Sequence, residues 1–252
     1  MMRLVLAAVL LAAASAAAQT AAQTRADYAR EKRWADQVVP NLVVGDAVYL
    51  EAPGAARFLA LHARVEKAKG AVVLAHGPGW HPDHGITGEL RVHLVDAGYT
   101  TLSLQMPVLG AEDEGGPEYA KLVPEGAQRI AAGVRYLQER GAARVAIVSH
   151  ATGSAMAYRY LTDNRSAPVF AWAALSFYGV YGDIAHAPFP VLDLYGASDY
   201  RGIRGPAGER KRVLDTVAGA KQIALREGGR FLAGGEKEAL REVRTFLDAA
   251  LK

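Results

Sequence analysis

The 252-residue sequence contains no cysteine. Disulfide bonds, thiolate catalysis and cysteine-ligated zinc are therefore excluded. The sequence also has no block of basic residues and no stripe of alternating aromatic and basic residues, and its formal net charge is only +3. We expect no nucleic-acid partner for such a chain.

A single long apolar run is present, at the N-terminus. One positive charge, Arg3, precedes the run, and the small residues Ala16–Ala18 follow it before Gln19. This pattern is typical of a secretory signal peptide, and the run is too short for a stable membrane span. We therefore expect a cleaved signal peptide over residues 1–18, a periplasmic location in a bacterium, and no membrane span after cleavage.

The rest of the chain predicts one α/β domain. Polar, Ala-rich residues 19–33 predict a flexible segment that ends in a short helix, and residues 34–252 predict a single domain that opens with two antiparallel strands around the Pro53–Gly54 turn. Short β-branched runs then alternate with helical patterns, which indicates a mostly parallel sheet with helices on both faces. The predicted strands are 43–50, 58–65, 70–75, 99–104, 145–148, 169–177, 190–195 and 222–225, and the predicted helices are 86–97, 127–140, one starting at 152, 205–217 and 236–251. Loops at the carboxyl ends of the strands form the ligand crevice of such a sheet, and these loops are 76–85, 105–125, 149–153 and 196–204.

The stretch Arg144–Ala157 has the pattern around which this domain is organised. A buried strand, a sharp turn and a helix with small residues follow one another, which is the context of the G-x-S-x-G nucleophile elbow. Gly153 fits the second glycine, so the first glycine position falls on Ser149 and the nucleophile position on Ala151. Alanine has no nucleophilic atom, so the pattern favours a fold more strongly than a reaction.

Four segments extend this likeness along the chain. They are Gly45–Leu50, Val73–Asp83, the run from Leu90 to Pro107, and His150–Ser154. Together they resemble the α/β-hydrolase superfamily and, within it, the bacterial family DUF3530, over a stretch from about residue 28 to residue 250. The resemblance implies an α/β-hydrolase fold and an exported protein whose elbow often lacks serine, and it implies no particular reaction.

The catalytic triad of such a fold runs in the order nucleophile, acid, histidine. Asp199 follows the strand 190–195 in a Gly-x-x-Asp turn and has the acid position, or alternatively caps the next segment. All seven histidines precede Asp199, and Arg230 is the nearest fit to the histidine position. Arginine stays protonated and cannot serve as a general base. A shifted elbow would make Ser149 the nucleophile, although Ile147 then stands at a glycine position.

The loop after the strand 70–75 keeps the features of an oxyanion loop. His76, Gly77 and Gly79 precede Trp80, whose backbone N–H is a candidate donor to a bound oxygen. The start of the helix after Ala151 favours anions at the same place, and Arg230 offers a second contact. We expect a ligand cleft lined by His76, Trp80, His150, Ala151 and Asp199. The alternative is that the glycines only permit a tight turn.

Histidines are concentrated near this cleft. His76, His81, Asp83, His84 and His150 have residue types that suit zinc, copper or nickel. The spacing matches no established zinc motif, so we expect packing and surface roles for them, with metal binding as the alternative, and no cofactor.

Loop 105–125 is either a solvated acidic loop or a lid over the cleft.

Three functions agree with these patterns. The first is a degenerate hydrolase-fold protein that binds a small molecule or a protein partner in the old cleft. The second is an active, esterase-like hydrolase that uses Ser149 or a histidine or metal site. The third is a scaffold in which the cleft has no role.

The signal-peptide pattern makes a prediction about processing. We expect the exported protein to begin near Gln19, because the small residues before it suit cleavage. The intact mass of the protein recovered from the periplasm should lack the first residues, about 18 of them. A soluble exported product that still carries Met1 would contradict the prediction.

Overall fold

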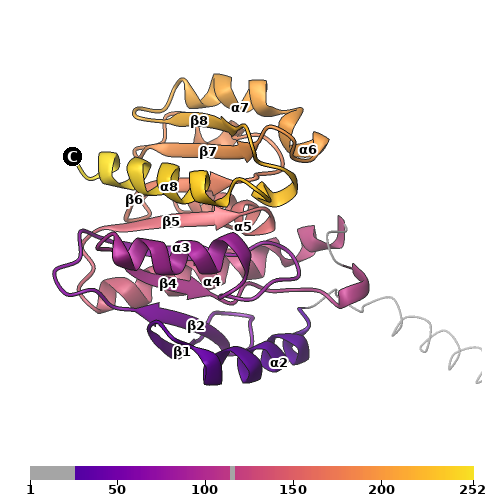
Figure 1. Cartoon of the computed structure of the whole chain (residues 1–252), viewed down its shortest axis with the longest axis vertical. Helices are drawn as coiled ribbons and strands as arrows, with labels where there is room; N and C mark the ends of the chain where they lie inside the picture. The colour runs from indigo at the N-terminus through magenta and orange to yellow at the C-terminus, as the bar shows by residue number, and fades with distance from the viewer. Residues whose placement is uncertain (1–25, 114–116) are drawn as a thin grey trace, which may run out of the picture.

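The computed structural model describes residues 26–113 and 117–252. Residues 1–25, with the predicted signal peptide and the first seven residues of the predicted flexible segment, lie outside the described residues. The described residues form an eight-stranded sheet with the order β1-β2-β4-β3-β5-β6-β7-β8 (Figure 1). β1 and β2 are antiparallel to their neighbours and the other strands are parallel, as the sequence predicts. The strands are β1 Asp46–Leu50, β2 Phe58–Ala63, β3 Ala71–Ala75, β4 Thr100–Leu104, β5 Val145–His150, β6 Val169–Leu175, β7 Val191–Gly196 and β8 Lys221–Leu225.

Helices cover both faces of this sheet. α3, Gly85–Asp96, and α8, Glu236–Ala250, lie on the face nearer the viewer in Figure 1, whereas α4, Val123–Glu139, and α5, Thr152–Asp163, lie behind it. Every residue of β3, β4 and β5 is buried, because strands covered on both faces read as continuous apolar runs. The predicted α/β-hydrolase arrangement of sheet and helices is thus confirmed.

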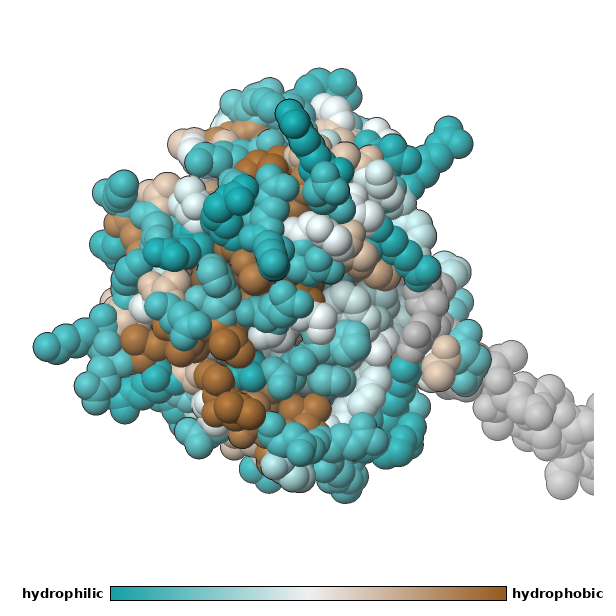
Figure 2. All heavy atoms as spheres, in the orientation of Figure 1, coloured by the Kyte–Doolittle hydropathy of each residue, from teal (hydrophilic) through white to brown (hydrophobic). Residues whose placement is uncertain are grey.

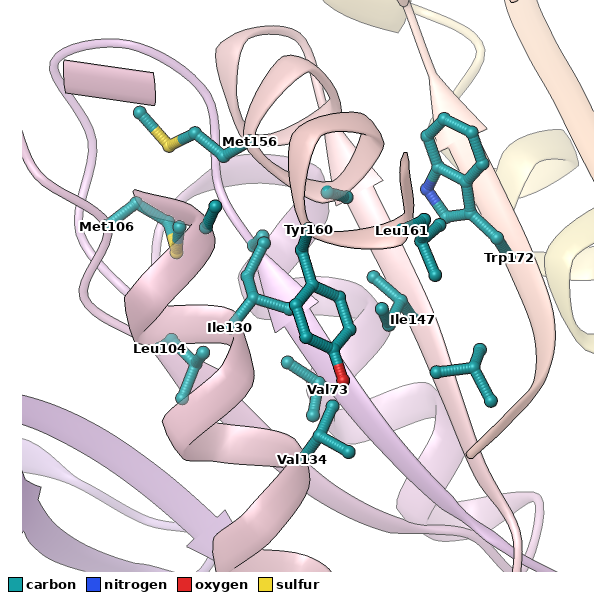
Figure 3. Close-up of a cluster of buried hydrophobic side chains, with 14 of the residues drawn as sticks. Val73, Leu104, Met106, Ile130, Val134, Ile147, Met156, Tyr160, Leu161 and Trp172 are labelled. Atoms are coloured by element: carbon teal, nitrogen blue, oxygen red, sulfur yellow. The ribbon is translucent and has the colours of Figure 1, made fainter. Parts of the chain in front are cut away.

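The larger of the two cores lies between the sheet and the helices α4 and α5. Ile130 and Val134 of α4 and Tyr160 of α5 gather over Val73 and Ile147 of the sheet (Figure 3). The backbones of α4 and α5 come close because Gly126 of α4 packs against Met156 of α5. This packing fixes the start of α5, and with it the elbow.

A buried ion pair holds the far side of the sheet. Asp193 in β7 accepts hydrogen bonds from Arg210 at 2.8 Å and from the hydroxyl of Tyr181 at 3.0 Å. Gln222 of β8 also donates to Asp193, at 2.8 Å. Arg210 belongs to α7, Ala207–Leu214, which follows the short helix α6, Arg201–Arg204. Asp193 thus points to hydrogen-bonded neighbours on both sides of its strand.

A helix begins in the last part of the predicted flexible segment 19–33 and continues into the predicted domain. The helix α2, Tyr28–Val38, is followed by a single turn, η1 Val39–Asn41, and Asp27 caps α2 by accepting from the N–H of Arg30 at 2.8 Å. Glu31 is 7% exposed, and Arg129 of α4 donates to its two oxygens at 2.9 and 3.2 Å. A partner 98 residues away therefore orders a stretch whose own composition is polar.

The described parts of the loop 105–125 contain helical turns. These are the short helices η2, Ala111–Asp113, and η3, Pro117–Leu122, and α4 begins at Val123, four residues before its predicted start. Pro124 in the first turn of α4 suits that position because its missing N–H would have no helical partner there. Two further short helices, η4 Gly182–Ile184 and η5 Arg230–Leu232, lie in the loops after β6 and β8.

One face of the molecule is mostly hydrophilic. Figure 2 shows its apolar atoms gathered in the lower part, where β1 and β2 lie in Figure 1. Among residues 26–113 and 117–252, no helix has both the length and the apolar composition that a membrane crossing requires.

The Glu31 site makes the stability of the protein depend on pH. Burial, and then the nearby Glu125, raise the pKa of Glu31 to about 7, because Arg129 is one cation between two carboxylates. The folded state therefore keeps a proton that the unfolded chain loses near pH 4.5, so stability falls as pH rises from 4.5 to 7. A pKa shift of this size corresponds to a change of about 3 kcal/mol in the free energy of unfolding.

We expect Glu31→Gln to remove this loss of stability. Thermal melting between pH 5 and pH 8 should show a flatter profile for the variant than for the unchanged protein. Asp36→Asn, an equal charge change at an exposed site on the same helix, should leave the profile unaltered. An equally steep profile in Glu31→Gln would rule out this role.

Candidate functional site

The turn between β5 and α5 has the conformation of a nucleophile elbow. Ala151, the predicted nucleophile position, takes φ 49° and ψ −115°, which an L-residue adopts only under strain. A Cβ on Gly153 would lie 2.5 Å from the carbonyl oxygens of Ala75 and His76, so only glycine lets α5 approach β3 this closely. The strained turn is present, and its apex carries a methyl group.

Asp199 lies at the acid position, and the protein already satisfies its carboxylate. The hydroxyl of Ser176 donates to one oxygen at 2.6 Å. The backbone N–H groups of Tyr200 and Phe231 donate to the other oxygen at 2.9 and 3.2 Å. Asp199 is 2% exposed, so it joins the loops after β6, β7 and β8 beneath the surface of the cleft.

Of the residues predicted near the histidine position, Phe231 lies against Asp199, one residue beyond the predicted Arg230. The N–H of Phe231 reaches Asp199, and its ring meets the rings of His150 at 5.3 Å and Trp80 at 6.0 Å between centroids. Arg230 is exposed instead, with its guanidinium 4.8 Å from the ring centre of Tyr200. The left-handed backbone of Phe231, with φ 54° and ψ 37°, reverses the chain at this point.

His76 is a buried packing residue. Its Nε2 accepts the backbone N–H of Met106 at 2.9 Å, so its Nδ1 carries the proton and donates to the carbonyl oxygen of Gly77 at 2.8 Å. Burial lowers the pKa of His76 to about 3. The side chain is neutral and joins the start of the oxyanion loop to the segment after β4.

His150 and Trp80 stack on each other. Their rings are 4.8 Å apart and inclined by 9°, and a Cβ on Gly77 would lie 2.7 Å from Nδ1 of His150. Burial lowers the pKa of His150 to about 3, and neither ring nitrogen has a hydrogen-bond partner among the described residues. His150 therefore acts as a flat apolar surface between Trp80 and Phe231.

The predicted oxyanion loop has few N–H groups left to bind a ligand. Pro78 has no N–H, and the N–H of Gly79 donates to the hydroxyl of Tyr119 at 2.9 Å. The N–H groups of Trp80 and Thr152 have no protein partner within the described part of the chain. The start of α5 at Thr152 is thus the main anion-favouring feature.

A pocket of about 650 Å³ opens above Ala151 at the carboxyl end of the sheet. Of the predicted lining residues, Trp80, Ala151 and Arg230 are on its wall, whereas His76, His150 and Asp199 are buried and do not line it. The loop 105–125 supplies one side of the pocket. The full lining is Pro78, Trp80, Pro117, Tyr119, Ala120, Val123, Ala151, Thr152, Ala155, Tyr178, Tyr200, Arg230 and Phe231.

The structure corrects the alternative nucleophile, Ser149. Its side chain is 2% exposed, its hydroxyl accepts from Nε1 of Trp172 at 2.9 Å, and it lies 3.1 Å from the hydroxyl of Ser154. Ser154 is fully buried and donates to the carbonyl oxygen of Leu175 at 3.3 Å. Both serines satisfy polar groups inside the core, and neither lines the pocket.

The alternative metal site is not assembled. Asp83 accepts from the buried guanidinium of Arg91 at 3.0 Å, and His81 and His84 pack edge to face at 5.3 Å. His76 and His150 are fully buried beneath the loop. Across residues 26–113 and 117–252 no three histidine or acidic side chains gather as metal ligands.

Apart from Trp80, the aromatic residues that wall the pocket are absent from the predicted cleft. Tyr119, Tyr178, Tyr200 and Phe231 come from four separate loops. Their common feature is a place just beyond the carboxyl end of a strand or at the start of a helix. An aromatic residue at each such loop is a signal that a reader of the sequence can use.

Comparison with known families gives one match. The model of the family DUF3530, described as a protein of unknown function, matches residues 1–125. No curated protein matches the sequence.

Solved structures show the same fold. Est1E from Butyrivibrio proteoclasticus has a TM-score of 0.65 at 13% identity and covers 81% of this chain and 98% of its own. A dienelactone hydrolase from Anabaena variabilis has a TM-score of 0.66 at 17% identity, covering 82% and 97%. An esterase from Pyrococcus furiosus has a TM-score of 0.61 at 14% identity, covering 83% and 98%. At these identities the likeness confirms the fold and carries no activity.

The geometry around Ala151 makes a prediction about serine chemistry. We expect no labelling of the unchanged protein by a fluorophosphonate, and none of Ala151→Ser, because the described site offers no base to accept the proton. Adding Phe231→His to Ala151→Ser should restore labelling and raise the turnover of p-nitrophenyl acetate at least tenfold, since triad members act as a unit.

The matched control places histidine one residue earlier, as Arg230→His with Ala151→Ser, and should stay inactive. Activity in the control alone would overturn the assignment of Phe231 to the histidine position. Labelling of the unchanged protein that disappears in Ser149→Ala would overturn the structural role of Ser149.

Proposed function

Because this chain belongs to the DUF3530 family and has the fold of an α/β hydrolase, we propose that it is an exported, periplasmic, non-catalytic protein that binds a small aromatic or apolar carboxylic acid in the pocket above Ala151. The observation that supports the proposal most is the pocket itself. A cleft of about 650 Å³ remains open over an elbow that has lost its nucleophile. That volume suits a small organic ligand.

The absence of a triad supports the non-catalytic part of the proposal. Hydrolysis through a serine needs a nucleophile, a base that takes its proton and donors for the oxyanion. Ala151 and Phe231 occupy the first two positions, and Pro78 removes one N–H from the loop that would supply the third. Three separate contributions are therefore missing at one site.

The walls of the pocket favour a flat, apolar ligand body. Five of the lining residues are aromatic, namely Trp80, Tyr119, Tyr178, Tyr200 and Phe231. Aromatic side chains stack on planar ligands and bury a large area with little loss of side-chain entropy. The stacked pair of Trp80 and His150 makes one wall rigid.

The charge of the lining favours an acid. Arg230 is the charged residue of the lining and has no acidic partner among the described residues. A guanidinium binds a carboxylate with two parallel hydrogen bonds. Burial and the neighbouring Tyr200 raise the pKa of Tyr178 to about 12, so its hydroxyl remains a donor. The similar protein Est1E was solved with ferulic acid, an aromatic carboxylic acid.

The proposal predicts selective binding of acids. In calorimetry, some members of a panel of benzoic, cinnamic and indole carboxylic acids should bind, and the corresponding primary amides should bind about tenfold more weakly, because a charged hydrogen bond is lost. Arg230→Gln should bring the affinity for the acid down to that for the amide. Ala155→Phe should block both by filling the pocket.

The control is Arg226→Gln, which removes the same charge from an exposed position on the same loop outside the lining. It should bind the acids as the unchanged protein does. A panel in which acids and amides bind equally well, or in which nothing binds, would reject the proposed ligand class.

A further inference from the structure

A second cleft lies at the opposite end of the sheet. It has a volume of about 790 Å³ and is formed by the loop between β2 and β3, the loop between α4 and β5, and the first residues of the strands. These loops lie at the amino ends of the parallel strands, on the left in Figure 1, far from the pocket above Ala151. Neither the fold nor the proposed function assigns a role to it.

Cations dominate the walls of this cleft. Five of its lining residues are basic, and one, Asp46, is acidic. Two of the cations are already held: Lys69 pairs with Asp248 at 3.0 Å, and Arg144 donates to the carbonyl oxygen of Leu251 at 2.9 Å. The remaining three, for which the described residues provide no acidic partner, are Arg64, Lys67 and Arg140.

Two of these three cations converge on one half-buried histidine. Arg140 lies 3.5 Å above the ring of Tyr136 and donates to its carbonyl oxygen at 3.3 Å. The hydroxyl of Tyr136 is 3.3 Å from Nδ1 of His62. Burial, and then the charges of Arg140 and Arg64, lower the pKa of His62, while Asp46, which pairs with His62 across β1 and β2, opposes them.

We propose that this cleft is an anion site that binds the phosphate group of a ligand, with Arg64 and Arg140 as charge-assisted donors and Lys67 as an additional cation. A phosphate carries up to two negative charges on a compact group, which matches several converging cations better than a single carboxylate does. The ring of Tyr136 holds the Arg140 guanidinium in place, so little side-chain freedom is lost on binding. The phosphate belongs either to a soluble ester or to a lipid headgroup.

Titration of the mature chain with inorganic pyrophosphate tests the site. Calorimetry should show saturable binding that weakens with added salt, as a charge-driven contact requires. The nuclear magnetic resonance signal of His62 should titrate at a higher pH when pyrophosphate is bound, because the anion offsets the two arginines. Arg64→Gln and Arg140→Gln should each weaken binding at least tenfold.

Arg135→Gln is the matched control. Arg135 is an exposed residue of α4, the helix that ends just before Arg140, and it lies outside this cleft. The control should bind pyrophosphate normally, and Arg140→Gln should still bind carboxylic acids in the pocket above Ala151. Vesicles of phosphatidylglycerol form the second arm. Binding to vesicles without binding to pyrophosphate, lost in Arg140→Gln, assigns the phosphate to a lipid, whereas binding to pyrophosphate assigns it to a soluble ligand.

Two results would overturn the proposal. One is the absence of binding to both probes. The other is binding that Arg64→Gln and Arg140→Gln leave unchanged.

Discussion

The close approach of α5 to β3 is the constraint on which the functional end of the molecule depends. Gly153 permits this approach, and the strained Ala151 makes the turn that leads into it. A residue in such a conformation costs about 1–3 kcal/mol and persists only where its surroundings determine it. Here the N–H of Ala151 is fixed to the carbonyl oxygen of Leu175 at 2.9 Å, and its own carbonyl oxygen accepts from Ser154 at 3.0 Å. The elbow is therefore kept by packing and hydrogen bonds that do not need a nucleophile.

Hydrogen bonding also keeps the acid in place without a histidine. Asp199 accepts three hydrogen bonds, from Ser176, Tyr200 and Phe231. These donors come from the loops after three neighbouring strands, so the carboxylate ties together one side of the pocket. Replacing it would leave buried donors without a partner, which costs about 1–3 kcal/mol for each group. A carboxylate at this position thus has a structural role whether or not the site performs chemistry.

Much of this arrangement follows from local sequence, and the exceptions have physical reasons. Ala151, Gly153 and Asp199 follow from spacing, because strand, turn and helix impose fixed positions on an elbow and on the turn after a strand. The exchange of Arg230 for Phe231 does not follow, since it depends on the positive φ of a non-glycine residue in a loop. The docking of α2 against the sheet's helices depends on the pairing of Glu31 with Arg129 across the fold, which no local pattern contains.

The grouping of cations in the basic cleft is also not predictable from local sequence. Its cations come from segments about 75 residues apart, so no run of the sequence is strongly basic and the net charge of +3 conceals them. Only the parallel sheet, which places the loops before β3 and β5 side by side, gathers them. The two ends of the sheet consequently differ in chemistry: one offers aromatic walls with a single arginine, and the other offers several cations.

The proposed non-catalytic function also changes what the pocket above Ala151 can do with its binding energy. An enzyme gains rate only from contacts that are stronger in the transition state than with the bound substrate, so tight binding of the ground state is of no use to it. Without a nucleophile at Ala151 or a base at Phe231, that constraint is absent. Every favourable contact with the aromatic walls and Arg230 then adds to affinity, and a closed lining with few mobile parts becomes an advantage. Under the proposed function, a hydrolase fold with alanine and phenylalanine at these two positions is suited to holding a small acid without converting it.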